Sequence, residues 1–241
     1  MFTRAELKLK SKAAMKANYW RSVGAGLLLS ICIGGTAFSA GRSSGEHVEE
    51  LHHSFDTMDP ETAMILIVAI LLAVGFAFCL SSFFKVLLLN PLMVGCRHFF
   101  RKNLYEPQPM GEVTWGFRNF YGRNLVTIFL SNIFILLWGL LLIVPGFIKS
   151  YSYRLVPYIL EDHPDLSPTE AITLSRRMMN GQKMNAFVLD LSFLGWLILS
   201  AVSLGLAGVF YVNPYKAGTD AAFYEAVRAE YYGNSPFNGI G

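Results

Sequence analysis

The sequence predicts an all-α membrane protein with six transmembrane helices, arranged as three repeats of an amphipathic helix followed by a helical hairpin. Three observations lead to this prediction. Hydrophobic residues make up 53% of the 241 residues and charged residues only 15%, whereas charged residues make up about 25% of a typical soluble domain. The apolar runs approach the length of about 20 residues that a helix needs to cross a bilayer. Lysine and arginine gather at one end of these runs, which is typical of cytoplasmic segments.

The first predicted element is an amphipathic helix at the N-terminus. It begins at Thr3, which is followed three residues later by Glu6, the signature of a capping box. Its polar face carries lysines at intervals of four residues, and its end carries a tryptophan: Lys8, Lys12, Lys16 and Trp20. This combination is typical of a helix that lies on an anionic membrane surface, and a solvated helix is the alternative.

The first predicted hairpin follows this helix. Residues 22–40 are apolar and rich in small residues, which allow close contacts between membrane helices. Residues 41–61 are mostly acidic and are expected to form an outside loop. Residues 62–89 form the second predicted span. We expect Pro91 to bend or end this span, because proline cannot donate a helix hydrogen bond.

The second predicted repeat begins after a proline-containing linker at residues 106–111. An amphipathic stretch leads to Gly122-Arg123-Asn124, which we interpret as an elbow before the third span at residues 125–144. Pro145 and Gly146 predict the outside turn. The fourth span, residues 147–160, returns with Pro157 near its end.

The third predicted repeat has the clearest helix start. Ser167, Pro168 and Glu170 provide the N-cap, the first helical residue and the capping-box partner. Gly181 is expected to end this helix, and residues 184–200 form the fifth span. A turn at residues 203–208 then leads into the sixth span, which ends near Pro214.

The whole chain, residues 1–241, is predicted to be a single integral membrane domain with repeats at about 1–105, 106–163 and 164–232. Of the 20 lysines and arginines, only Arg42 and Lys149 fall in or beside the predicted outside turns. Both termini are therefore expected on the cytoplasmic side. A four-span arrangement is the alternative, in which residues 125–160 form one broken helix and its amphipathic extension.

Several stretches of the chain resemble a known family. They are Asn90-Pro91-Leu92 with Gly95, Leu137-Trp138 through Ile143-Val144-Pro145-Gly146 to Tyr153, Ser175-Arg176-Arg177 through Lys183, Leu191 through Trp196, and Pro214-Tyr215 with Phe223-Tyr224. These stretches are similar to the domain of unknown function 975 family of bacterial integral membrane proteins, and more remotely to the membrane domain of some glycerophosphodiester phosphodiesterases. The resemblance implies a protein of the bacterial cytoplasmic membrane with uncharacterised activity. It implies no catalytic residues.

One candidate metal site lies in the acidic loop. Glu49, His52, His53 and Asp56 would share one face of a helix, and carboxylate and imidazole groups at this spacing can bind a divalent transition metal. A solvated charged face is the simpler interpretation, so we expect no metal and no cofactor. The sequence contains no phosphate-binding glycine loop and no serine-hydrolase or zinc-protease motif. We therefore expect a protein that is not an enzyme, and a metal-dependent activity at the acidic outside loop is the alternative.

Ionisable residues within the apolar runs are the stronger candidates for a functional site, because burying a charge in lipid is costly. They are Lys85, Lys149, Arg154, Asp190 and Asp220. Asp190 is expected to pair with Arg154 or Lys85. Such a pair either stabilises the helix bundle or lines a polar route for a transported solute.

The basic residues at the ends of the runs are the candidates for lipid headgroup contacts. They are Lys8, Lys12, Lys16, Arg118, Arg123, Arg176, Arg177 and Lys183, together with Trp20. We expect anionic lipid as the partner and no nucleic acid, and the sequence leaves a second copy or another membrane protein open as a partner. The predicted function is a non-enzymatic lipid-interacting or envelope accessory protein. A small transporter that uses Asp190, Lys85 and Arg154 is the alternative.

Overall fold

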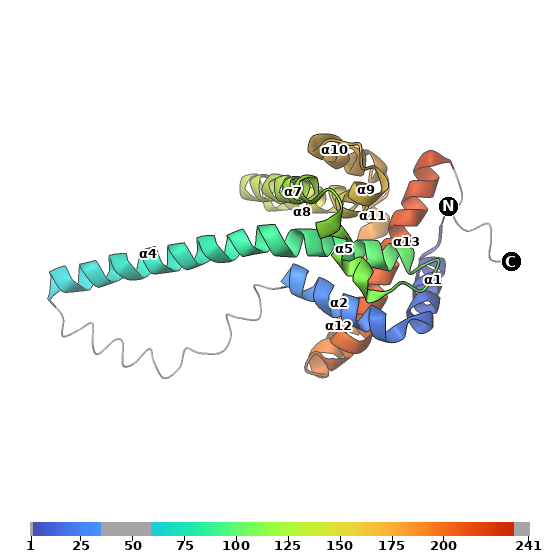
Figure 1. Ribbon diagram of the computed structural model, residues 1–241, viewed down its shortest axis with the longest axis horizontal. Coiled ribbons are helices and arrows are strands. Elements are labelled where there is room, and N and C mark those ends of the chain that lie inside the picture. The colour runs from blue at the N-terminus through green and yellow to red at the C-terminus, as the bar shows by residue number, and fades with distance from the viewer. Residues whose placement is uncertain (1, 35–58, 234–241) are drawn as a thin grey trace.

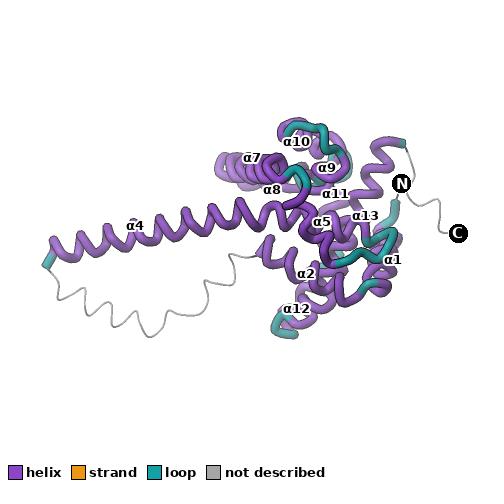
Figure 2. Tube along the Cα trace, viewed as in Figure 1, coloured by secondary structure: helices purple, strands orange, loops and turns teal. Residues whose placement is uncertain are grey.

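The computed structural model describes residues 2–34 and 59–233, and within these ranges every regular element is a helix (Figure 2). This confirms the predicted all-α class. Figure 1 shows a packed group of helices from which one long helix projects. The helices differ sharply in how much of their apolar surface they bury, and this difference organises the fold.

The N-terminal half contains α1 (Arg4–Ala17), α2 (Tyr19–Gly34), α4 (Pro60–Phe84), the π-helical turn η1 (Lys85–Leu89), α5 (Asn90–Lys102), the 3₁₀ turn η2 (Met110–Thr114) and α6 (Trp115–Arg118). The C-terminal half contains α7 (Tyr121–Leu141), α8 (Ile143–Ser152), α9 (Val156–Asp162), α10 (Pro168–Met178), α11 (Lys183–Leu191), α12 (Leu194–Val202), the π-helical turn η3 (Gly208–Val212) and α13 (Asn213–Tyr232).

Two helices begin as the sequence predicts. The backbone N–H of Thr3 donates to Glu6 at 2.9 Å, and the N–H of Ser167 donates to Glu170 at 2.9 Å. In each case the hydroxyl of the capping residue also accepts the N–H of the glutamate, which completes a capping box. These contacts set the start of α1 and of α10 by local chemistry alone.

The buried core lies where α5, α9 and α13 meet. Phe99, Tyr158 and Tyr224 come from these three helices and are fully buried, and the rings of Tyr158 and Tyr224 stack 5.0 Å apart. Three further segments cover this centre, each on a different helix: α1 packs on α13, η2 and α6 pack on α5, and α10 packs on α9. We call this packed group the helical body.

The remaining helices expose their apolar side chains. Among the described residues, three continuous helical stretches are long and apolar enough to cross a bilayer: Glu61–Lys102, Tyr121–Leu141 and Lys183–Val202. The most apolar part of the first stretch buries no side chain within the structure, and it forms the projecting helix of Figure 1. The helix at Tyr19–Ile33 is apolar but shorter. These helices are compatible with a membrane protein, whereas six spans remain a prediction.

Contrary to the prediction, two prolines do not end their helices. The helix runs without interruption from α4 through η1 into α5, so Pro91 lies inside it, and η3 likewise runs into α13 past Pro214. A π-helical turn precedes each proline, and this wider turn accommodates the missing N–H and the proline ring. Pro157 differs, because it lies in the first turn of α9 after a break at residues 153–155.

The predicted outside turn at Pro145 and Gly146 is also wrong in position. The chain reverses at Leu142, which is extended, with φ −157° and ψ 135°. Pro145 lies in the first turn of α8, where a helix tolerates proline because the N–H there has no partner within the helix. Gly146 packs directly on Gly139 of α7, and a Cβ at Gly146 would lie 2.5 Å from the Gly139 Cα. The glycine therefore permits close packing of the hairpin.

Candidate functional site

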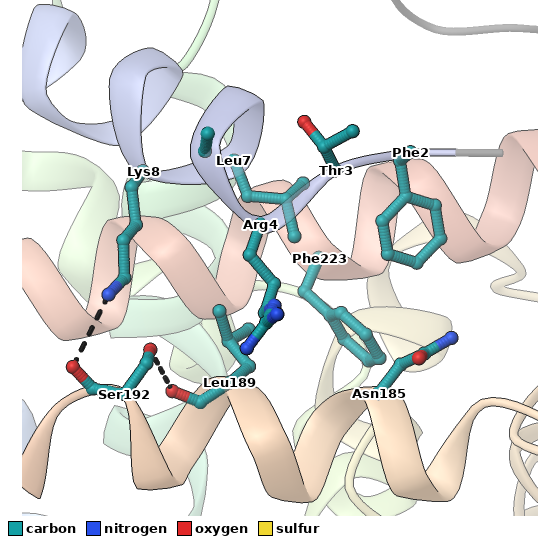
Figure 3. A pocket seen from close by; sticks show the side chains of 10 residues that line it. Phe2, Thr3, Arg4, Leu7, Lys8, Asn185, Leu189, Ser192 and Phe223 are labelled. Carbon is teal, nitrogen blue, oxygen red and sulfur yellow. Dashed lines mark hydrogen bonds between the residues drawn. The ribbon is translucent and has the colours of Figure 1, made fainter.

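A cavity of about 580 Å³ lies between the first half of α1, α11 and α13 (Figure 3). It is lined by Phe2, Thr3, Arg4, Ala5, Leu7, Lys8, Asn185, Leu189, Ser192 and Phe223. Segments from both ends of the chain form it, because α1 packs on α13. We call it the α1–α11 cavity.

The charge lining this cavity is wholly positive. Arg4 and Lys8 are its charged residues, and Arg4 makes no ion pair among the described residues. The Lys8 Nζ donates to the Ser192 carbonyl oxygen at 3.3 Å and lies 4.6 Å from the centre of the Phe193 ring. Burial, together with the neighbouring charges of Arg4 and Lys12, lowers the pKa of Lys8. A bound anion would relieve this repulsion.

Apolar side chains form the other walls of the cavity. Leu7 and Leu189 are fully buried, and the rings of Phe2 and Phe223 meet edge to face at 5.7 Å. The nearest carboxylate of α1, Glu6, is held by the capping box at Thr3. The cavity therefore offers two cations and an apolar surface, which suits a molecule with an anionic head and an apolar part.

A second polar cluster lies between α8, α11 and α13. The guanidinium of Arg154 donates to Asp190 at 2.6 and 2.9 Å and to Asp220 at 2.7 Å. Lys216 completes the cluster, at 2.9 Å from Asp190 and in contact with Asp220, and the Tyr151 hydroxyl donates to Asp190 at 2.9 Å. Arg154 and Asp190 thus pair as the sequence analysis expected, within a larger set of four charges.

Lys85 does not join this cluster. Its side chain is exposed on η1 and makes no ion pair within the described part of the chain, so the prediction that it is a buried partner of Asp190 is wrong. Its place on an apolar run was the reason for the prediction, but in the structure the Lys85 side chain is exposed. Lys149 is half-buried, with its Nζ 4.6 Å from the centre of the Trp138 ring.

A third cluster, which the sequence analysis did not identify, joins the three central helices. Arg101 of α5 lies 2.9 Å from Glu161, 2.8 Å from Asp162 and 2.5 Å from Glu225. His98 lies between Glu161 at 2.9 Å and Glu112 at 3.0 Å. α5 and α9 carry these charges near their ends, and α13 carries Glu225 in its second half, but nothing in the sequence brings the three helices together. The cluster is enclosed by the helical body and links its helices.

The predicted headgroup residues occupy different environments. Lys16, Trp20, Arg118, Arg176 and Arg177 are exposed, whereas Lys8, Lys12 and Lys183 are half-buried. The Lys12 Nζ lies 5.5 Å from the centre of the Tyr215 ring.

Arg123, which the sequence analysis assigned to lipid headgroups, binds backbone carbonyls of the protein instead. Its guanidinium donates to the carbonyl oxygens of Leu160 at 2.5 Å and His163 at 3.0 Å, and also to that of Pro164. These carbonyls lie at or just beyond the C-terminal end of α9, where carbonyl groups lack partners within the helix. Arg123 therefore caps α9 with its two terminal guanidinium nitrogens, which are bound to the protein.

The candidate metal residues Glu49, His52, His53 and Asp56 lie outside the described residues. Within the ranges that the structure describes, no group of three or more histidine, cysteine, aspartate or glutamate side chains is arranged to hold a metal ion.

Comparison with known proteins yields one match. A family model described as "Protein of unknown function (DUF975)" matches residues 42–231, which is most of the chain. No curated protein and no solved structure matches significantly. The remoter resemblance to glycerophosphodiester phosphodiesterase membrane domains is therefore unsupported.

Proposed function

The chain belongs to the DUF975 family of proteins of unknown function, and we propose that it is a non-enzymatic, multi-pass protein of the bacterial cytoplasmic membrane that binds anionic lipid. The α1–α11 cavity carries this proposal. Arg4 and Lys8 supply two positive charges beside an apolar wall, with no carboxylate in the lining. α11 opens a stretch compatible with a membrane span and exposes Met184 and Leu191. Lipid at α11 would thus be close to the two cations.

The proposed topology has six spans, with both termini in the cytoplasm. α7, with 21 residues, is about 31 Å long at 1.5 Å per residue, and α4 has 25 residues, so each is long enough to cross a bilayer. α2 is shorter, with 16 residues. The second helices of the second and third hairpins reach the length of a span only if α8 is counted together with α9, and η3 together with the start of α13. The exposed cations Lys16, Arg176 and Arg177 support a cytoplasmic helical body.

The proposed threefold repeat has support from two matching hydrogen bonds. The Tyr19 hydroxyl donates to the carbonyl oxygen of Phe210 at 3.0 Å, and the Tyr121 hydroxyl donates to that of Leu87 at 2.9 Å. Each tyrosine is the first residue of α2 or α7. Each accepting residue lies four positions before a proline, Pro214 or Pro91. The same hydrogen bond, from a tyrosine hydroxyl to the carbonyl four residues before a proline, thus occurs between the first and third repeats and between the second and first repeats.

The alternative of a transporter with a route through Asp190, Lys85 and Arg154 has no observation in its favour. Lys85 is exposed and apart from the other two. Asp190 and Asp220 each contact both Arg154 and Lys216, so the carboxylates are already neutralised within the protein.

Lipid retention in native mass spectrometry tests the proposed function. The purified protein is titrated with phosphatidylglycerol or phosphatidylcholine, and bound lipid is counted. We expect retention of phosphatidylglycerol, reduced about a hundredfold or more in the double variant R4Q/K8Q, because each of the two charge-assisted contacts contributes about 1.5–3 kcal/mol. K102A is the control, since it removes an exposed cation at the end of α5. Equal retention of the two lipids by the unmodified protein would refute the proposal.

A further inference from the structure

In each proposed repeat an apolar helix follows the amphipathic helix, and these apolar helices are α2, α7 and α11. The first residue of this helix distinguishes the third repeat from the other two. α2 and α7 begin at Tyr19 and Tyr121, whereas α11 begins at Lys183. Both tyrosines donate to a carbonyl oxygen of a neighbouring helix and so close the contact between two hairpins. Lys183 makes no such bond among the described residues and is half-buried. The corresponding contact in the third repeat is therefore left open.

A groove occupies this open position. It has a volume of about 250 Å³, lies between α8 and α11, and is lined by Phe147, Ile148, Tyr151, Lys183, Met184 and Phe187. Lys183 is its charged residue, and the other five side chains are aromatic or aliphatic. The groove thus combines one cation with a long apolar surface.

Aromatic rings give the groove a fixed wall. The rings of Phe147 and Tyr151 lie 5.2 Å apart, and Phe187 lies 6.2 Å from Phe147 and 6.3 Å from Tyr151, all near edge to face. Tyr151 is held in addition by its hydrogen bond to Asp190. These ring contacts form one continuous aromatic wall of the groove.

The surface of the groove is continuous with the apolar surface that faces outward. Ile148 is 46% exposed and Met184 is 68% exposed, and both line the groove. A volume of about 250 Å³ lies below the range of about 300–1,000 Å³ that is usual for compact ligands. An extended hydrocarbon chain fits this shape better than a bulky solute.

We propose that this groove between α8 and α11 binds one acyl chain of an anionic phospholipid, with Lys183 contacting the phosphate. The inference rests on the proposed binding of anionic lipid and assigns to it a second site, separate from the α1–α11 cavity. Lys183 lies at the start of α11, so a chain that runs along the helix from Lys183 passes Phe187 one turn later. The phosphate stays at the end of the apolar stretch, where headgroups lie.

Native mass spectrometry with defined lipids tests this assignment. We expect K183A to weaken retention of phosphatidylglycerol by about tenfold, because it removes one charge-assisted contact, and K183R to restore it. F187A should weaken retention of long-chain lipid while leaving the headgroup preference unchanged. R177A is the matched control, since Arg177 is an exposed cation six residues away that lies outside the groove.

The outcomes separate this inference from the proposed function. If the unmodified protein retains no phosphatidylglycerol, the proposed function fails and this site fails with it. If R4Q/K8Q weakens retention but K183A behaves like R177A, only the second site is refuted. Glycerol phosphate, which has no acyl chain, is the competitor that identifies the source of the phosphate. Displacement of lipid by glycerol phosphate at equal concentration would also overturn the assignment to a lipid.

Discussion

At the scale of single residues, Arg154 joins three distant parts of the chain. It lies in the break between α8 and α9, and its guanidinium reaches Asp190 of α11 and Asp220 of α13. Lys216 supplies a second cation to the same two carboxylates. The cluster holds two positive and two negative charges, and its side chains are between 14% and 29% exposed. Its stability therefore depends on this charge balance.

This balance predicts a rescue between two substitutions. R154A leaves two neighbouring carboxylates with one lysine, and we expect a loss of about 2 kcal/mol, below the about 3–5 kcal/mol of a fully buried pair because solvent reaches the cluster. D190N leaves one excess cation, and should cost less because asparagine still accepts a hydrogen bond. The double variant R154A/D190N keeps the balanced pair of Lys216 and Asp220, so it should be more stable than R154A alone.

Thermal unfolding in detergent, followed by tryptophan fluorescence, measures these differences. The cluster is structural by this account, so all three variants should retain anionic lipid like the unmodified protein. Additive losses in the double variant would show that the four charges do not act as one cluster.

The sequence predicts residue contacts of this kind only in part. Arg154 and Asp190 stand out because an ionised side chain within an apolar run needs a partner. Lys85 satisfies the same criterion, yet its side chain is exposed in the structure, and only the orientation of the helix decides this. Arg101 could not be identified in this way. It lies among other polar residues, which resemble a solvated helix end until folding brings α5, α9 and α13 together.

At the scale of the elements, Tyr121 supplies a hydrogen bond that Pro91 cannot donate. Pro91 has no N–H to offer the carbonyl of Leu87, four residues earlier, and the Tyr121 hydroxyl donates to this carbonyl instead. A carbonyl without a donor is costly within an apolar run that water does not reach, so the tyrosine compensates for the proline. The hydrogen bond also attaches the start of α7 to the long helix.

A double-mutant cycle tests this compensation. We expect Y121F to lower the free energy of unfolding by about 1 kcal/mol, the usual contribution of one such hydrogen bond. In the P91A background the alanine N–H can donate to Leu87, so the loss caused by Y121F should fall towards zero. The mixed pair Y121F/P214A serves as the control, because these residues belong to different contacts and their effects should add. An unchanged loss in P91A would contradict the compensation.

The elements show why helix existence could be predicted better than helix boundaries. Both capping boxes define helix starts by contacts within three residues, and the sequence predicts them correctly. Pro145 and Gly146 gave a wrong turn position because the same two residues also suit the first turn of a tightly packed helix. Only the contact between Gly146 and Gly139 distinguishes the two cases, and that contact belongs to the folded hairpin.

At the scale of the whole molecule, three segments cover the three central helices in a cyclic order. η2 and α6 cover α5, α10 covers α9, and α1 covers α13, so the first helix of the chain closes on the last. Ser11 and Tyr215 form part of this closure through a hydrogen bond of 2.9 Å from the serine hydroxyl to the carbonyl oxygen. This closing contact places both ends of the described chain on one helical body, which agrees with the proposed location of both termini on one side of the membrane.

The packing of α1 on α13 bears on the proposed number of spans. Three crossings, one for each stretch long enough by itself, would place the two ends on opposite faces of the bilayer, whereas α1 packs on α13. An even number agrees with this contact, and the proposed number is six, two for each hairpin.

Single cysteines in a variant without the three native ones test the proposed six spans. We expect a membrane-impermeant maleimide to label I143C and L204C, at the hairpin tips, in intact spheroplasts, and to label K16C and E230C only after permeabilisation. All four native side chains are exposed, so access depends on the membrane and not on packing. Labelling of K16C from outside would reverse the topology, and unlabelled tips would mean that the hairpins enter the bilayer without crossing it.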